Sequence, residues 1–184
     1  RHLPPGEKTP ADVPDDQLRL VALAVANTRA TARYRVADGA EAVVRLDLEG
    51  TELKWGLTLE NQSSLDIVEV SFPLVRGVSL GEASADDLLA VPDAAGGHEV
   101  VDPARWGGGM TSYPAGGGMA WVDLYEREPS HGLYLSCHDP TLLGCRLGAT
   151  AEPGSDKLAL AVTKLAHVRP GRTWEAPTCV MGVH

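Results

Sequence analysis

The stretch VVRLDLEGTELKWGLTLE, residues 43–60, decides the fold class of this chain. Apolar residues alternate with polar ones on both sides of Gly50: Val44, Leu46 and Leu48 before it, and Leu53, Trp55, Leu57 and Leu59 after it. A period of two is the pattern of a β-strand that has one buried face and one wet face. Residues 43–60 therefore predict two antiparallel strands joined by a tight turn.

Similar short runs fill most of the chain on either side of this pair. They lie at residues 18–22, 31–36, 67–74, 119–125, 132–137, 142–148, 157–165 and 178–183. Asp38-Gly39 predicts a hairpin turn, because glycine tolerates a positive φ. About ten strands with very little helix predict an all-β fold, an antiparallel β-sandwich.

The pattern is weaker between Arg76 and Gly118. Residues 85–91 predict one short helical turn with Ser84 as its N-cap. The remainder of that stretch, rich in glycine and proline, predicts a long loop excursion, and loops of this length in compact domains are usually functional or disordered.

Length and charge limit the organisation and the partners of the chain. A chain of 184 residues fits one domain, which we expect at 17–184, after an extended lead-in or linker at 1–16 that is rich in proline and charge. The net charge of −9, with scattered basic residues, argues against a nucleic-acid partner. No apolar run has membrane-spanning length, so no membrane partner is expected, and localisation is left open.

The cysteine and histidine spacings favour neither a metal nor a cofactor. Cys137, Cys145 and Cys179 form no CxxC pair, and no two of the six histidines are two or four residues apart. Buried free thiols are the simplest interpretation, and a Cys137–Cys145 disulfide is the alternative.

The stretch YPAGGGMAWVDLYEREPSHGLYLSCHDP, residues 113–140, carries the candidate site. Aromatic rings beside hydrogen-bonding side chains suit a sugar, because a pyranose has an apolar face and a rim of hydroxyls. The candidate carbohydrate contacts are Trp106, Tyr113, Trp121, Asp123, His138 and Asp139. The alternative is structural: Trp121 belongs to the core, and the two aspartates bond to nearby backbone.

Three segments, taken in order, resemble one family. They are LKWGLTLENQSSLDIVEVSFPLVRGV at 53–78, the stretch at 113–140, and VRPGRTWEAPTCVMGVH at 168–184. Together they resemble the galactose-mutarotase-like β-sandwich, a supersandwich, that precedes the catalytic barrel in bacterial glycoside-hydrolase-like proteins. The likeness runs from about Leu18 to the end of the chain, and the order and spacing of the segments carry it.

The resemblance implies an accessory, carbohydrate-associated domain of a multidomain glycoside hydrolase. The sequence stops at His184, where the barrel of such proteins would begin. The domain would pack on that barrel, or on another chain, and border its substrate cleft. Apolar faces left uncovered without the barrel predict self-association.

Two other functions stay open. A self-sufficient sugar mutarotase needs a general acid and a general base, for which His131, His138, Asp123 and Glu126 are available. The signature segments of aldose epimerases are not recognisable, however. A purely structural assembly module is the other alternative. No carboxylate pair suited to glycoside hydrolysis stands out, so no catalytic residue is assigned.

Overall fold

A computed structural model describes residues 2–3, 17–36, 39–81, 84–128 and 131–184. The chain folds almost entirely into antiparallel β-strands with very little helix, which confirms the expected all-β sandwich class. It divides into two compact units, Arg1–Val70 with Leu165–Thr178 and Ser71–Lys164 with Cys179–His184. Among the described residues, no helix has the length and apolar character needed to cross a membrane.

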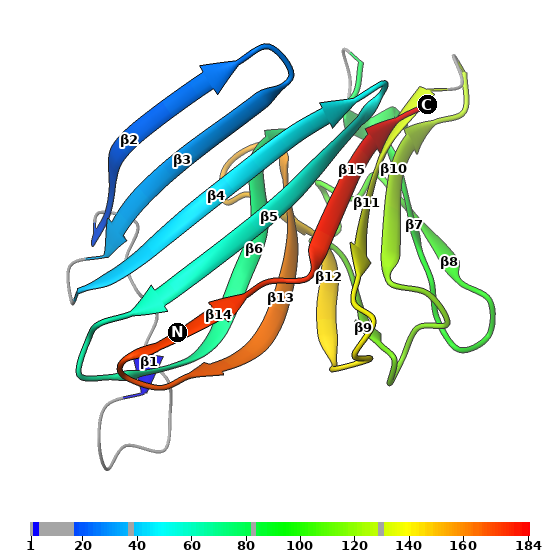
Figure 1. Cartoon of the computed structure of the whole chain (residues 1–184). Helices are drawn as coiled ribbons and strands as arrows, with labels where there is room; N and C mark the ends of the chain where they lie inside the picture. Colours follow the sequence, from blue (N-terminus) through cyan, green and yellow to red (C-terminus); the bar gives the residue numbers. More distant parts are fainter. Residues whose placement is uncertain (1, 4–16, 37–38, 82–83, 129–130) are drawn as a thin grey trace. The chain divides into compact units, whose positions relative to one another are not determined.

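The first unit is built on four consecutive strands that pair in sequence order, as Figure 1 shows. They are β2 (Leu18–Ala26), β3 (Arg29–Val36), β4 (Ala40–Glu49) and β5 (Glu52–Asn61). Leu46 lies opposite Trp55 and Leu48 opposite Leu53, so the strand pair predicted from residues 43–60 is confirmed. β14 (Arg172–Glu175) also pairs with β5.

A small apolar core holds the first unit together. It consists of Val36, Ala40, Leu59, Ile67 and Val168, with Trp174 and others packed against it. Ile67 and Val168 come from β6 (Asp66–Val78) and β13 (Leu158–Val168), and β1 (His2–Leu3) pairs with β6. These side chains cover one end of the apolar face that the period-two pattern creates.

Asn61 fixes the turn between β5 and β6. Its buried side-chain amide donates to the carbonyl oxygens of Leu65 (2.8 Å) and Val168 (2.7 Å). Its side-chain oxygen accepts from the backbone nitrogen and the hydroxyl of Ser63. A buried polar group with all its partners specifies one local structure, because any alternative leaves it unsatisfied.

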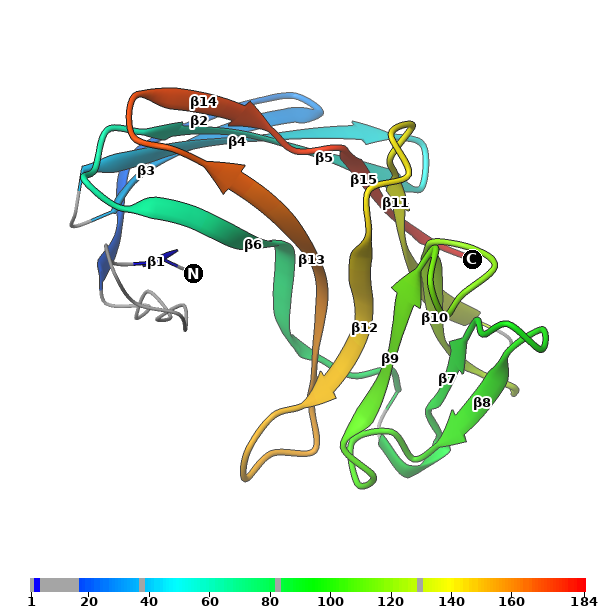
Figure 2. The same cartoon turned by 90° about the horizontal axis from the view of Figure 1, so that it is seen from below.

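The second unit has two layers of strands, which Figure 2 shows from below. In one layer β12 (Cys145–Ala151) pairs with both β9 (Gly108–Tyr113) and β13. In the other, β8 (His98–Val101), β7 (Leu88–Val91), β10 (Trp121–Glu126) and β11 (His131–His138) pair in that order, and β15 (Thr178–Val183) lies beside β11. Fully buried side chains fill the unit: Leu89, Val122, Leu124, Leu135, Leu147, Leu160 and Val162.

Two predictions for the region between Arg76 and Gly118, the helical turn and the long loop, are wrong in part. The helical turn is only η2 (Ser84–Asp86), and the rest of the expected turn forms strand β7. The expected loop excursion contains β8 and β9 as well. Weak periodicity misled the prediction here, because short strands of four to six residues offer too few alternations to stand out.

Two further predictions fall wholly or partly on residues that are not described. Most of the lead-in, residues 4–16, lies outside the described part of the chain, so the domain boundary at residue 17 stays a prediction. Asp38 of the expected hairpin turn is also outside it, whereas Gly39 has the positive φ of 94° that the turn requires.

Candidate functional site

Strand β10 presents a polar and aromatic face away from the core. Val122 and Leu124 are fully buried, while Trp121, Asp123 and Tyr125 are half-buried on the other face. The alternation expected from the sequence is therefore confirmed. Trp121 is not a core residue, which removes the alternative interpretation of this ring.

An open cavity of about 650 Å³ in the second unit brings four of the six candidate residues together. Tyr113, Trp121, His138 and Asp139 line it. The other lining residues are Gly118, Met119, Ala120, Ser136, Cys137 and Pro140. Its wall combines two aromatic rings with a hydroxyl and an imidazole, and its volume falls in the range of small-ligand pockets.

Ser136 and His138 form the polar part of this wall. They stand two apart on β11, so their side chains lie on one face, and the Ser136 hydroxyl lies 3.1 Å from His138 Nε2. Ser136 also lies opposite Trp121 in the register of β10 and β11. A hydroxyl and an imidazole beside an indole ring supply both donors and acceptors next to an apolar surface.

Asp139 lines the cavity, but its carboxylate is committed to the fold. One oxygen accepts from the backbone nitrogen (2.8 Å) and the hydroxyl (2.6 Å) of Thr141, and the other accepts from the buried ammonium of Lys164. Burial alone would raise the pKa of Asp139, but the hydrogen bonds from Lys164 and Thr141 outweigh burial and hold the pKa below its ordinary value. The structural role foreseen for Asp139 therefore describes this side chain better than sugar contact does.

Asp123 lies on the same strand face as Trp121 but outside the cavity lining. Its carboxylate oxygens lie 3.1 and 3.2 Å from His184 Nε2. The imidazole lies over Gly132: a Cβ atom added there would be 2.6 Å from the same nitrogen. Tyr134, opposite Asp123 on β11, similarly lies over Gly182.

Trp106 lies apart from the other candidates. Trp106 is 69% exposed. The guanidinium of Arg105 lies over its ring, 5.2 Å from the ring centroid. Trp106 does not line the cavity beside Trp121. The structure therefore places Tyr113, but not Trp106, beside Trp121 in this cavity.

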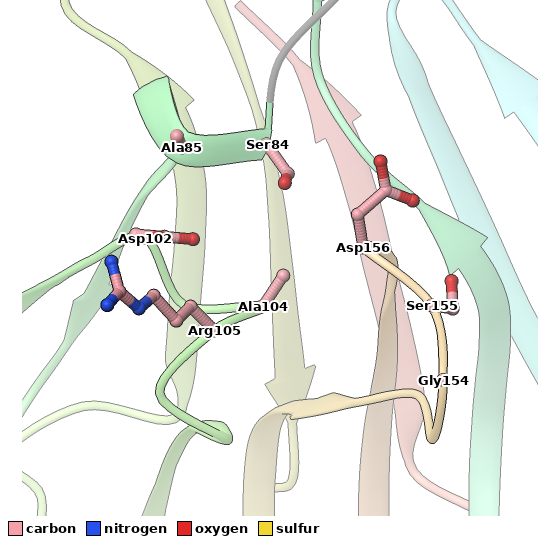
Figure 3. Close-up of a pocket in the computed structure, with 8 residues that line it drawn as sticks. All are labelled: Ser84, Ala85, Asp102, Ala104, Arg105, Gly154, Ser155 and Asp156. Carbon is pink, nitrogen blue, oxygen red and sulfur yellow. The ribbon is translucent and has the colours of Figure 1, made fainter.

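A second open groove, of about 590 Å³, lies near Trp106 in sequence (Figure 3). Its lining is polar and small: Ser84, Ala85, Asp102, Ala104, Arg105, Gly154, Ser155 and Asp156. Figure 3 shows the loop that carries Asp102 to Arg105 facing the turn of Gly154 to Asp156 across it. No aromatic side chain lines this groove, so it lacks the stacking surface of the cavity beside Trp121.

The three cysteines are buried thiols that form no disulfide. The pKa of the Cys137 thiol is raised to about 12: its hydrogen bond with Cys145 lowers the pKa, but the hydrogen bond with Cys179 and burial prevail. The hydrogen bond with Cys137 and burial also raise the pKa of Cys145. Protonated thiols are neither nucleophiles nor metal ligands. Within the described residues, no three His, Cys, Asp or Glu side chains are placed to hold a metal ion.

Each acid–base candidate for a mutarotase contacts a neighbouring side chain. His131 Nε2 lies 2.9 Å from a carboxylate oxygen of Glu126, so a sugar ring cannot stand between these two groups. Asp123 is paired with His184 instead, and His138 with Ser136. General acid and base on opposite sides of one reacting carbon need a separation that these contacts do not provide.

Solved structures resemble the chain, although no family model and no curated protein matches its sequence. A galactose mutarotase related enzyme from Lactobacillus acidophilus matches with a TM-score of 0.59 and 13% identity, covering 91% of this chain and 71% of that one. The GH36 α-galactosidase AgaA from Geobacillus stearothermophilus, in complex with raffinose, matches with a TM-score of 0.56 and 12% identity over 90% of this chain. The fold is galactose-mutarotase-like.

A third structure extends this galactose-mutarotase-like group. The α-N-acetylgalactosaminidase NagBb from Bifidobacterium bifidum, in complex with GalNAc, has a TM-score of 0.57 and 12% identity, and the match covers 91% of this chain. The chain spans about a quarter of each glycosidase, 25% of AgaA and 27% of NagBb. At such low identities the likeness establishes the fold alone.

Sequence reasoning missed Tyr134, Ser136 and His184. Ser136 and Tyr134 stand on β11 opposite Trp121 and Asp123. His184 meets Asp123 across 61 residues of sequence. Alternation places Tyr134 and Ser136 on the face of β11 that carries His138, so the period-two rule gave a usable signal for both. No local signal points to His184.

Proposed function

We propose that this chain is a non-catalytic, sugar-contacting sandwich of a multidomain glycoside hydrolase. It packs on a catalytic barrel and borders the substrate cleft of that barrel. The cavity beside Trp121 is the observation that carries this proposal, because it joins two aromatic rings to a hydroxyl and an imidazole in one open wall. The three resembling segments and the galactose-mutarotase-like fold support it.

Within this cavity, Trp121 and Tyr113 are the stacking groups and Ser136 and His138 the hydrogen-bonding groups. A pyranose ring presents C–H bonds to an aromatic face and hydroxyls to its rim. Asp139 holds the end of β11 through Lys164 and Thr141 rather than touching sugar. Asp139→Ala would leave the buried ammonium of Lys164 without its carboxylate partner, so it tests stability and not binding.

Sugar titration followed by NMR tests the binding half of the proposal. Galactose, N-acetylgalactosamine and raffinose are the first ligands to try, because two structural neighbours carry GalNAc and raffinose. We expect amide shifts confined to 113–121 and 136–140, with a dissociation constant of about 1–10 mM, which is usual for a shallow open site.

Two variants and one matched control sharpen the test. Trp121→Ala removes the stacking ring and should weaken binding about tenfold, equivalent to about 1.4 kcal/mol. His138→Ala removes one polar contact and should weaken binding less. Trp106→Ala deletes an exposed indole outside the cavity and should leave affinity unchanged. Shifts that centre on Trp106, or no shifts at about 50 mM sugar, contradict the proposal.

The barrel half needs a different measurement. The coding sequence that follows codon 184 should encode a (β/α) barrel in the same frame. In that longer protein Trp121→Ala should lower kcat/KM for a glycoside substrate, whereas unchanged activity would leave the chain a purely structural module.

A self-sufficient mutarotase is the second candidate. The observation that favours it is the His184–Asp123 pair, an imidazole held by a carboxylate on the strand face that carries Trp121. The purified chain would then accelerate the decay of optical rotation of fresh α-galactose or α-glucose. We expect no acceleration, because Asp123 is bonded to His184 and Glu126 to His131, so these candidate acids and bases satisfy one another.

A further inference from the structure

Strand β2 is a long, apolar sheet edge. In the described part of the chain it pairs with β3 alone, and all nine of its residues are exposed. Its sequence, LRLVALAVA, contains one charged residue, Arg19, and neither proline nor glycine. Soluble proteins usually protect an edge with lysine, proline or a short strand, because unpaired backbone groups recruit another strand.

The second half of β2 is the part that is ready to pair. A bulge lies between Leu20 and Ala22, after which Ala22 to Ala26 run in unbroken register with β3. Leu23 and Val25 are 61% and 69% exposed. A regular run of five residues without a charge offers alternate backbone N–H and C=O groups to an incoming strand.

One face of this run is apolar and the other carries only small side chains, and both features favour an added strand. Leu23 and Val25 lie opposite Ala32 and Ala30 of β3, which continue into the apolar rows of β4 and β5. The other face carries only Ala22, Ala24 and Ala26, whose small side chains do not obstruct a neighbouring strand. An added strand would therefore extend the apolar face at Leu23 and Val25, and the alanines on the other face would not obstruct it.

Charge argues against an acidic partner at this edge. β3 carries three arginines next to β2. Arg29 lies 2.7 Å from Asp47 and Arg35 lies 2.9 Å from Glu41, so these two guanidinium groups are paired with β4. Arg33, which lies opposite Ala22, adds one positive charge beside the run. The edge itself is apolar, so an acidic peptide or nucleic acid gains little there.

We propose that β2 pairs antiparallel with β2 of a second copy of this chain, about a two-fold axis through Ala24. This register places Leu23 opposite Val25 of the second copy and Val25 opposite its Leu23. A two-fold interface must be complementary to itself, and the run from Ala22 to Ala26 meets that condition. The pairing joins two four-stranded arrays into one continuous sheet.

The small area of this interface predicts a weak dimer. Two short edge strands bury less than the ~1,600 Å² of a standard stable interface, so dissociation at micromolar concentrations is expected. Sedimentation velocity from about 10 µM to about 1 mM should show the sedimentation coefficient shifting from monomer to dimer.

Charge-swap variants test the register itself. Val25→Lys and Leu23→Glu should each abolish dimerisation, and both sites are exposed enough to keep the monomer folded by circular dichroism. An equimolar mixture of the two variant proteins should dimerise again, because position 25 of one copy faces position 23 of the other. Leu143→Lys is the matched control: its side chain is 61% exposed outside β2, and that variant should dimerise like the parent chain.

Several outcomes overturn the proposal. The first is a parent chain that sediments as a monomer throughout the concentration range. The second is dimerisation of both edge variants at the parent's strength. Loss of dimerisation without recovery in the mixture overturns the antiparallel register. None of these outcomes depends on sugar, so failure here leaves the proposed function intact.

Discussion

Asp87 has a buried carboxyl group, and only one of its two oxygens has a hydrogen-bond partner among the described residues. The residue is 1% exposed. One oxygen accepts from the Leu80 nitrogen at 3.4 Å, and the other has no hydrogen-bond partner among the described residues. Burial, with a smaller contribution from the nearby Glu126 carboxylate, raises the pKa of Asp87 to about 6.

A raised carboxyl pKa sets the sign of the pH dependence. Between pH 3.8 and about 6 the folded state binds more protons than the unfolded state, so the free energy of unfolding falls as pH rises through this range. Asp87→Asn keeps the shape and removes the charge. At pH 7 it should stabilise the protein by about 1–3 kcal/mol, and near pH 4 the gain should vanish.

Urea unfolding of the parent chain and the Asp87→Asn variant at pH 4, 5, 6 and 7 measures this difference. Asp86→Asn is the matched control, since Asp86 is exposed one residue away and should change stability by less than about 0.5 kcal/mol at every pH. A gain that is the same at all four pH values would show that charge burial is not the cause.

At the scale of elements, glycine lets β9 and β12 approach closely. Gly148 has a φ of 156°, and a Cβ atom there would lie 2.1 Å from the carbonyl oxygen of Gly109. Gly108 has a φ of 86°, and its added Cβ would lie 2.2 Å from the carbonyl oxygen of Ala149. The obstructing atoms are backbone and cannot rotate away. Gly108, Gly109 and Gly148 thus serve packing within the fold.

Gly148→Ala should therefore destabilise the second unit by about 2–4 kcal/mol, through both the clash and the positive φ. Gly118→Ala is the control, because nothing lies within 4 Å of the added Cβ. Chemical denaturation of the two variants should separate them clearly. Equal stability would mean that β9 and β12 can shift apart at little cost.

Period-two alternation predicted the strands around Gly50 and the outward face of Trp121, because one buried face imposes that pattern locally. It failed where the deciding contacts are distant in sequence. Lys164 holds Asp139 across 25 residues, and His184 meets Asp123 across 61. Such pairs meet only through the register in which the strands pair, and that register cannot be read from the local sequence of one strand.

At the scale of the whole molecule, net charge opposes the pairing proposed for β2. Each copy carries −9, so two copies repel one another at low ionic strength. The edge contact itself is apolar and main-chain in character, and salt weakens neither contribution. Screening therefore acts on the repulsion alone.

Raising sodium chloride from about 50 mM to about 500 mM should tighten the β2 dimer several-fold, because the Debye length falls well below the size of the chain. Sedimentation of the parent chain at fixed protein concentration measures the shift, and the control variant Leu143→Lys should show the same trend. A dimer that dissociates as salt rises would instead rest on ion pairs between copies. The apolar run of Ala22 to Ala26 would then not be the contact.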